Sequence, residues 1–418
     1  MGFVVSPNAK SWIRVDANSH FPIQNLPFGV ADLGEDSQVL VTRIGDFAVD
    51  ILGLIEGGVL AEYGFDEAEG FSEIGKMNFV ELRRGLYDLL REGNPKLRDN
   101  SKLKKEVMLP AEELRMLLPM EVPSFVDFYS GIHHASNVGK MFRPDMPALL
   151  PNYRYLPVGY NGRASSVVPS EVPIIRPKGQ TKAADADVPT FGPTQELDFE
   201  LELGFFLIEG NEFGESIPVA QAENYIGGLV LVNDWSARDV QRWEYQPLGP
   251  FLAKSFATSV SPWLVTLDAL EPFRIDGQKQ DPEPLPHLRR PRLNHFDIVL
   301  EVSLQTEKMT APQIISQTNS KELYWSFAQQ LAHQTSNGTP TEPGDLYASG
   351  TISGPEEGMF GSMLELAWRG SKPIVMNETG EERRFIEDGD TVRLTGYCVG
   401  KGYRIGFGTL ENQVMPSL

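Results

Sequence analysis

The sequence has little cysteine and no long apolar run, and each shortage excludes a class of protein. Its 418 residues include one cysteine, Cys398, so no intrachain disulfide forms and no zinc site built on cysteines is available. The longest apolar run, Leu229–Val232, is far shorter than the roughly 20 residues that a membrane-spanning helix needs. The N-terminus lacks the charged and then apolar pattern of a secretory signal. We therefore expect a soluble protein of the reducing cytoplasm.

Positive charge is also scarce. Lysine and arginine total 37 against 57 aspartates and glutamates, which leaves a net charge of −20. Such a field repels nucleic-acid phosphates and anionic lipid headgroups, so neither nucleic acid nor a membrane is an expected partner. A small anionic substrate binds only where basic side chains locally outweigh this field.

The length predicts two domains, which we place at residues 1–118 and 119–418. Glycine (39) and proline (31) are plentiful and dispersed, which favours many short strands joined by turns, so we predict a mainly β protein with a few helices. The first domain carries no convincing cluster of acids, histidine or lysine, and we expect a structural role for it. Its predicted elements are strands at Val39–Ile44 and Phe47–Ile51, a helix at Phe79–Leu90 and an exposed basic loop at Arg91–Lys105.

The second domain contains longer strand-like runs and most of the residues capable of chemistry. Helical patterns begin near Ser130 and Ser236. The predicted strands are Leu197–Phe206, Leu229–Val232, Phe296–Gln305 and Thr391–Tyr397.

Acidic and apolar residues alternate along one of these strands. Because strand side chains have a period of two, Asp198, Glu200 and Glu202 are expected to share one face while Phe199 and Leu201 point into a core. Alone, this pattern is more typical of a solvated strand face. A metal site becomes the better interpretation only if further acids converge on it.

Two other acids follow buried runs. Asp234 ends the run at Leu229–Val232, and Asp127 follows Phe125 and Val126. Four converging carboxylates about 4 Å apart would repel by about 4 kcal/mol a pair at an effective dielectric constant of 20, so they would require a cation. All-oxygen ligation selects a hard ion, Mg²⁺ or Ca²⁺. The sequence alone does not show that the four meet.

Candidate bases and their partners lie nearby. His134 follows Asp127 by two helical turns, although the adjacent His133 competes for the same role. A histidine base needs an acceptor that orients it, and Glu365 is a candidate. Its apolar neighbours are equally compatible with a buried carboxylate and with an exposed one on an alternating strand.

Cationic and polar groups follow Asp234. If Ser236 caps a helix, then Arg238, Gln241 and Tyr245 share one face of it. Without context an ordinary polar helix face is slightly favoured. Lys254 stands inside an apolar run and therefore either snorkels to solvent or pairs with a carboxylate.

Residues 343–354 form a turn rich in glycine and small hydroxyls, which can bring backbone N–H groups close to an anion. No phosphate-binding fingerprint is present, and a plain glycine-rich hairpin explains the segment as well.

Taken together, these segments resemble the fumarylacetoacetase family in the family's order. The resemblance covers nearly the whole chain and is carried by Phe21–Gly29, Asp127, the run His134–Arg143, Glu200 with Glu202, Asn233–Gln241 and the turn Gly344–Gly354. Small departures at Ser136, Lys140 and Ala257 affect fine specificity and not the reaction.

The resemblance implies a fold, a site and an assembly. The fold is a small N-terminal SH3-like barrel followed by a C-terminal mixed β-roll, and the assembly is a homodimer. A Ca²⁺ or Mg²⁺ ion is expected on four acids, a second Mg²⁺ near Asp234, and a base oriented by a carboxylate. The implied residues are Asp127, Glu200, Glu202 and Asp234 for the first ion; Asp234, Lys254 and Thr258 for the second; His134, Glu365, Arg238, Gln241 and Lys254 for catalysis; and Tyr129, Arg143, Tyr160, Arg238, Gln241, Tyr245 and Thr351 for substrate binding.

The implied activity is metal-dependent hydrolysis of a carbon–carbon bond in 4-fumarylacetoacetate, the last step of tyrosine and phenylalanine catabolism. The nearest alternatives are an acylpyruvate hydrolase or a hydroxymuconate-type isomerase or decarboxylase, which resemble only the C-terminal part. An alternative of another class is a non-catalytic Ca²⁺-binding module, which has no use for His134, Glu365 and Lys254 together.

Overall fold

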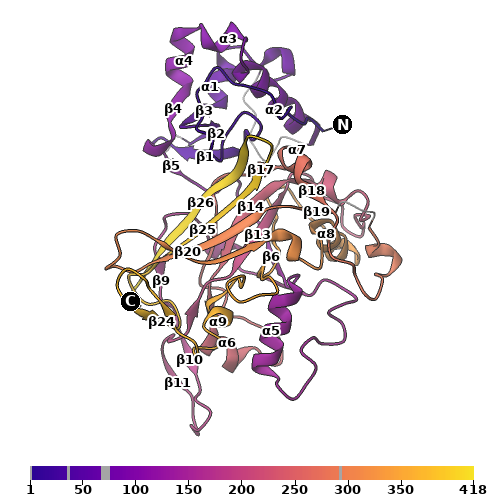
Figure 1. Ribbon diagram of the computed structural model, residues 1–418. Helices are drawn as coiled ribbons and strands as arrows, with labels where there is room; N and C mark the ends of the chain where they lie inside the picture. Colours follow the sequence, from indigo (N-terminus) through magenta and orange to yellow (C-terminus); the bar gives the residue numbers. More distant parts are fainter. Residues whose placement is uncertain (1, 35–37, 67–75, 291–293) are drawn as a thin grey trace.

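The computed structural model describes residues 2–34, 38–66, 76–290 and 294–418. A small N-terminal part, which combines one sheet with several helices, stands on one end of a larger C-terminal part, and the chain as a whole is mainly β, as expected (Figure 1). Among the described residues, no helix combines the length and the apolar character that crossing a membrane requires.

The N-terminal part pairs an antiparallel sheet with helices that cover it. Within the described residues its strand order is β4-β3-β2-β1-β5. The predicted strands and the predicted helix are confirmed, but the predicted loop at Arg91–Lys105 is wrong because Asn94 and Asn100 each cap a short helix there. The elements are β1 (Phe28–Asp32), β2 (Gln38–Ile44), β3 (Phe47–Asp50), α1 (Ile51–Glu56), α2 (Lys76–Leu90), α3 (Pro95–Arg98), α4 (Ser101–Val107), β4 (Met108–Pro110) and β5 (Arg115–Met116).

The C-terminal part is organised around a large mixed sheet with the order β7-β6-β22-β13-β14-β16-β8, in which β17 also pairs with β14. A second sheet, β21-β20-β25-β26-β9, packs against it. The strands of the large sheet are β6 (Phe125–Phe128), β7 (Gly159–Asn161), β8 (Val167–Pro169), β13 (Leu201–Leu207), β14 (Ile226–Asp234), β16 (Thr258–Val260), β17 (Val265–Thr266) and β22 (Leu346–Ala348). Those of the second are β9 (Ile174–Ile175), β20 (Val299–Gln305), β21 (Gln313–Asn319), β25 (Thr391–Val399) and β26 (Arg404–Met415).

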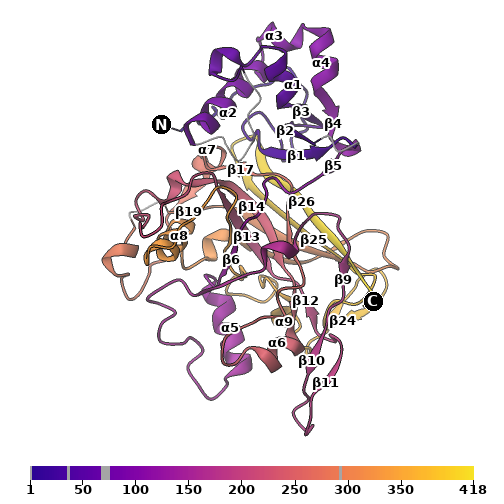
Figure 2. The same cartoon turned by 180° about the vertical axis from the view of Figure 1, so that it is seen from behind.

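Short hairpins and helices complete this part. Figure 2 shows the β10–β11 hairpin projecting from the end that is opposite the N-terminal part. Helices α5, α6 and α9 gather at the same end (Figures 1 and 2). The helices are α5 (Ile132–Phe142), α6 (Arg238–Glu244), α7 (Leu267–Leu270), α8 (Phe327–Thr335) and α9 (Met363–Leu366), and the paired strands are β10 (Lys178–Thr181) with β11 (Thr190–Pro193), β12 (Leu197–Asp198) with β15 (Ser236–Ala237), β18 (Arg274–Ile275) with β19 (His295–Phe296), and β23 (Ile374–Val375) with β24 (Glu382–Arg383).

Strand β14 is apolar on both faces because both are covered. Leu229 and Leu231 belong to the core of the C-terminal part, whereas Val230 and Val232 belong to the core shared with the N-terminal part. All four side chains are fully buried, and burial of each contributes about 1.5–3 kcal/mol. This double burial holds the end of β14, and with it Asp234, in a fixed position.

Candidate active site

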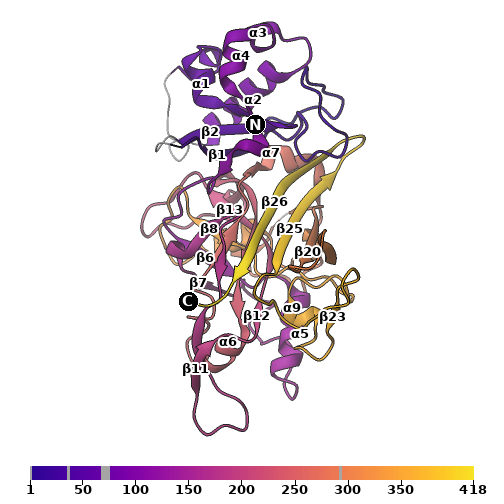
Figure 3. The ribbon, with the colours of Figure 1, turned by 90° about the vertical axis from the view of Figure 1, so that its left-hand side faces the viewer.

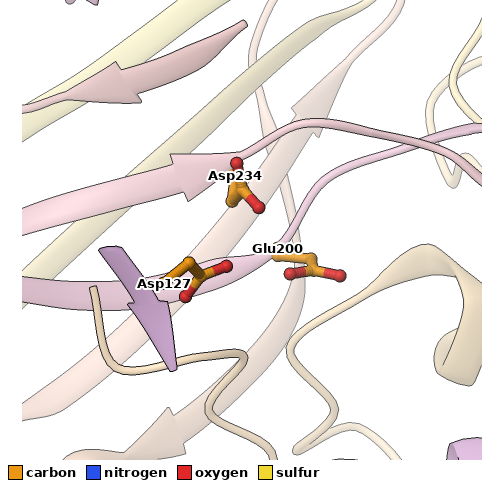
Figure 4. A group of neighbouring side chains, drawn as sticks. All are labelled: Asp127, Glu200 and Asp234. Carbon is orange, nitrogen blue, oxygen red and sulfur yellow. The ribbon is translucent and has the colours of Figure 1, made fainter. Parts of the chain in front are cut away.

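Three carboxylates from separate strands converge at one end of the large sheet. Asp127 lies on β6, Glu200 precedes β13 and Asp234 ends β14 (Figure 4). Their oxygens lie within 4.8 Å of one another, and all three side chains are buried. The convergence that the sequence left open is therefore present for these three acids.

Glu202 borders this cluster on β13. Its Oε2 accepts the backbone N–H of Gly350 at 3.0 Å, while its buried Oε1 has no hydrogen-bond partner among the described residues. Burial raises its pKa, and repulsion from Asp127 and Glu200 raises it further. The glycine-rich turn thus presents a backbone donor, and its acceptor is one of the protein's own buried carboxyl groups.

The predicted strand around Asp198 is interrupted. The chain leaves regular strand pairing between β12, which ends at Asp198, and β13, which begins at Leu201. Phe199 and Leu201 still point into the core as expected. Asp198 accepts N–H groups from Met363 and Leu364 at 2.6 and 3.1 Å.

Asp198 also accepts from Nε of Arg238 at 2.7 Å, and Nη2 of the same guanidinium lies 2.8 Å from Glu200. Burial opposes ionisation of Arg238, but the two carboxylates outweigh it and raise its pKa. Asp198 therefore joins α9 to α6 and holds Arg238 beside the carboxylate cluster.

Lys254 is paired and does not reach solvent. Its Nζ lies 2.7 Å from Glu200 Oε2 and 2.8 Å from Asp234 Oδ2. Burial lowers its pKa, yet Asp234 and Glu200 reverse that effect, so the group stays an ammonium ion. Asp234 accepts two further hydrogen bonds, from Tyr160 Oη at 2.7 Å and from Thr258 Oγ1 at 2.7 Å.

The cluster has the properties of a cation site. Burial raises the pKa of Asp127, and the charge of Asp234 raises it further. In addition, Oδ1 of Asp127 is buried without a hydrogen-bond partner among the described residues. Five buried carboxylates, those of Asp127, Asp198, Glu200, Glu202 and Asp234, face the two buried cations Arg238 and Lys254. If all five were ionised, they would exceed the two cations by three negative charges, and a divalent hard cation would reduce this excess to one.

His134 and Glu365 form a buried pair next to the cluster. His134 Nδ1 lies 2.6 Å from Glu365 Oε2, and both side chains are almost fully buried. Burial raises the pKa of Glu365, but His134 and its other hydrogen-bond donors outweigh burial and keep it low. Glu365 is thus buried on a helix, and the alternative of an exposed strand residue is wrong. His133 lies near Glu322 instead.

Sequence reasoning missed the other groups that hold Glu365. Asn137 donates to its Oε1 at 2.9 Å, and the hydroxyls of Ser353 and Ser362 donate to its Oε2 at 2.8 and 2.9 Å. Two signals could have found them: Asn137 follows His134 by three residues on one helix, and Ser362 precedes Glu365 by three, which is the spacing of a helix capping box.

A cavity of about 440 Å³ opens over the cluster and suits a small ligand. It contains Asp127, Glu200, His134, Arg238 and Lys254. The expected substrate contacts on its wall are Tyr129, Arg143, Tyr160, Gln241 and Tyr245, and an apolar side is formed by Val138, Phe142, Leu150, Leu248 and Pro250. Thr351 does not line this cavity; its hydroxyl is buried without a hydrogen-bond partner among the described residues.

Helix α6 carries Arg238 and Gln241 into the cavity, although the predicted cap is wrong. Ala237 occupies the N-cap position, and Ser236 points its hydroxyl at Glu200 Oε1, 3.3 Å away. Arg238 Nη1 donates to Gln241 Oε1 at 3.2 Å, which leaves the amide N–H groups of Gln241 available as donors.

Comparison with known proteins shows the family of the chain. Residues 24–119 match the family described as fumarylacetoacetase N-terminal, and residues 124–415 match fumarylacetoacetate (FAA) hydrolase C-terminal. The chain is 48% identical to fumarylacetoacetase of Homo sapiens, over 98% of this chain and 99% of that one, and 46% identical to fumarylacetoacetase of Dictyostelium discoideum, over 98% of both.

Among solved structures, 5-carboxymethyl-2-hydroxymuconate delta-isomerase from Mycobacterium smegmatis shares the fold, with a TM-score of 0.50 at 19% identity over 94% of this chain and 100% of that one. Both parts of the sequence and its full-length relatives lead to the same assignment: the chain belongs to the fumarylacetoacetase family.

Proposed function

We propose that the protein hydrolyses 4-fumarylacetoacetate to fumarate and acetoacetate, the last step of tyrosine and phenylalanine catabolism. The observation that carries this proposal is the buried His134–Glu365 pair beside three converging carboxylates in one cavity, in a chain with full-length fumarylacetoacetase relatives. A non-catalytic Ca²⁺ module would need the carboxylates but not the pair.

His134 acts as the general base in this proposal. With Nδ1 donating to Glu365, the imidazole has its lone pair on Nε2, which can accept a proton from water. The water oxygen then bonds to the carbonyl carbon on the fumaryl side, and the adjacent carbon–carbon bond breaks. The electron pair of that bond moves to the acetoacetate carbon, which takes up the proton that His134 removed from water.

Arg238, Gln241 and Lys254 are proposed to stabilise the oxyanion that forms on the attacked carbonyl. Arg238 and Lys254 are fixed by carboxylates before substrate enters, so little reorganisation is needed at the moment of reaction. Each such donor typically contributes about 2.7–4 kcal/mol.

Arg143 is proposed to bind a substrate carboxylate. Among the described residues it has no carboxylate partner, and its guanidinium donates only to the Ala148 carbonyl, at 3.2 Å. Tyr129 packs edge-on against the His134 ring, with centroids 5.4 Å apart, and shapes the same wall. Tyr160, Tyr245 and Thr351 complete the proposed substrate contacts.

A Ca²⁺ or Mg²⁺ ion is proposed on Asp127, Glu200, Glu202 and Asp234, and a second Mg²⁺ near Asp234, Lys254 and Thr258. The unpartnered oxygens of Asp127 and Glu202 support the first site. When bound, such an ion supplies Lewis-acid stabilisation of the diketonate oxygens. Lys254 is an ammonium ion without a lone pair, so its side chain would border the second site as a charge and not as a nitrogen ligand.

The direct test is incubation of Ca²⁺- or Mg²⁺-loaded protein with fumarylacetoacetate while fumarate is quantified. We expect fumarate and acetoacetate in equal amounts, and at least 10²-fold slower turnover in His134→Ala and Glu365→Gln. Metal-loaded protein that leaves this substrate intact but consumes an acylpyruvate or a hydroxymuconate would favour the related enzymes instead.

We also propose a cytoplasmic homodimer with a domain boundary between residues 118 and 119. Exposed apolar side chains near the cavity, Leu248, Phe251 and Leu252, support a partner surface. Sedimentation equilibrium would measure the mass of the assembly, and limited proteolysis would locate the boundary.

A further inference from the structure

A second cavity, of about 540 Å³, lies between the N-terminal segment and the β25–β26 hairpin. Residues between 7 and 24 form one side, and residues 401–404 at the tip of the hairpin form the other. Figure 3 shows this yellow tip beside the indigo N-terminal segment. We call this cavity the hairpin groove; it shares no lining residue with the cavity over the carboxylates.

The charge of the hairpin groove is opposite to that of the whole chain. Lys10, Arg14, Lys401 and Arg404 line it, with Asp16 as the acidic residue. The chain as a whole has 37 basic against 57 acidic residues, so four cations against one carboxylate is a local reversal. Among the described residues, none of the four cations forms an ion pair. Their charges are therefore available to a ligand.

The N-terminal wall of the groove is held in place by hydrogen bonds. The buried Gln24 amide donates to the carbonyls of Pro7 and Ala9 at 3.3 and 2.9 Å. Ser11 Oγ donates to the Leu90 carbonyl at 2.6 Å, which ties the segment to the end of α2. A ligand that enters the groove would not have to order this wall first, so the entropic cost of binding is reduced.

The hairpin wall is also oriented. The guanidinium of Arg404 stacks 4.0 Å from the centre of the Tyr397 ring, and Tyr397 is itself held by a hydrogen bond to Glu301. The single acid, Asp16, already accepts the backbone N–H of Asn18 at 2.8 Å. One oriented cation, Arg404, and three exposed cations around a partly occupied carboxylate suit an anionic ligand.

We propose that the hairpin groove binds a small polyanion, a molecule that carries two or more carboxylate or phosphate groups. The four cations match a ligand of several charges, and the net charge of −20 excludes large polyanions such as nucleic acid. Because the ligand would contact both the N-terminal segment and the C-terminal hairpin, its binding stabilises the docking of one on the other.

The test uses inorganic pyrophosphate and citrate as probes in calorimetric titrations of the full chain at constant ionic strength. The probe variant is the double substitution Arg14→Gln with Lys401→Gln. The matched control is Lys102→Gln with Lys105→Gln, which removes the same charge from exposed residues of α4 outside the groove. Circular dichroism verifies that both variants fold.

We expect saturable binding of at least one probe, a higher melting temperature with that probe, and roughly tenfold weaker binding in the groove variant alone. Tighter binding of pyrophosphate identifies phosphate as the preferred group, and tighter binding of citrate identifies carboxylate. Absence of saturable binding at millimolar concentrations overturns the proposal. So does equal binding by the two double variants, because the probes would then occupy the carboxylate-site cavity or no defined site.

Discussion

Replacement of Glu200 by glutamine is the sharpest test of the carboxylate cluster. The change keeps the shape of the side chain and removes one charge from a group whose oxygens lie within 4.8 Å of those of Asp127 and Asp234. Burial opposes the ionisation of Glu200, but Lys254 and Arg238 outweigh burial and keep its pKa low. Glu200 is therefore charged before any cation binds.

The size of the effect follows from the spacing. A cation held among oxygens within 4.8 Å of one another would lie no farther than this from Glu200, so at an effective dielectric constant of 20 one unit charge attracts it by at least about 3.5 kcal/mol. Loss of that much attraction for a cation weakens binding by roughly 10²–10³-fold. We therefore expect Glu200→Gln to lose both metal affinity and turnover.

Calorimetric titration with Ca²⁺ and with Mg²⁺ measures the affinity directly. Glu196→Gln is a matched control, because Glu196 lies four residues away and pairs with Arg242 at 2.7 Å instead of joining the cluster. His134→Ala is a second control that should lose turnover and keep metal affinity. Unchanged metal affinity in Glu200→Gln would refute the reasoning, and so would an equal loss in Glu196→Gln.

Three further changes test other parts of the structure. In Asp198→Asn an NH₂ group replaces one of the two oxygens that accept hydrogen bonds from Arg238 and Met363, so Arg238 loses its support. We expect kcat to fall by about 10² while the metal affinity measured by calorimetry is retained. Unchanged kcat would contradict this. Gly350→Ala should lower the unfolding free energy by about 2 kcal/mol or more, because φ is +77° and a Cβ would lie 2.4 Å from the Phe128 carbonyl oxygen. Denaturant titration measures this, and a variant as stable as wild type would disprove it. Burial lowers the pKa of His295 from 6.5 to about 4, so its neutral form contributes stability above pH 6.5 that is lost as the pH falls toward 4. Between pH 7 and 5 the unfolding free energy of wild type should fall by about 2 kcal/mol more than that of His295→Gln. Parallel pH profiles of the two proteins would contradict this.

Local patterns in the sequence were sufficient for many of the elements. The strands at β2, β3 and β25 and the helices α2 and α5 were predictable because hydrophobic periodicity reports which face of a segment is buried. The helices α3 and α4 were missed because their basic residues suggested a loop. The signal that outweighs composition there is the pair of asparagine caps.

Local patterns likewise predicted some of the site residues and not others. The sequence offered Asp127, His134 and Asp234 as acids and a base near the ends of buried segments, and the resemblance named their partners. It could not show that Asp198 binds the backbone of α9 and the guanidinium of Arg238, because these partners come from other segments of the chain.

The sequence by itself determined which chemistry was available: an acidic chain with almost no cysteine, acids at the ends of apolar runs, and one lysine inside such a run. Only the tertiary structure decided which of these groups meet. Asp127 and Asp234 are more than a hundred residues apart along the chain, and they become neighbours because β6 and β14 lie in one sheet whose two faces are buried by separate cores. Periodicity describes how one segment faces its surroundings, whereas the distance between two segments depends on strand order and packing, which no local pattern contains.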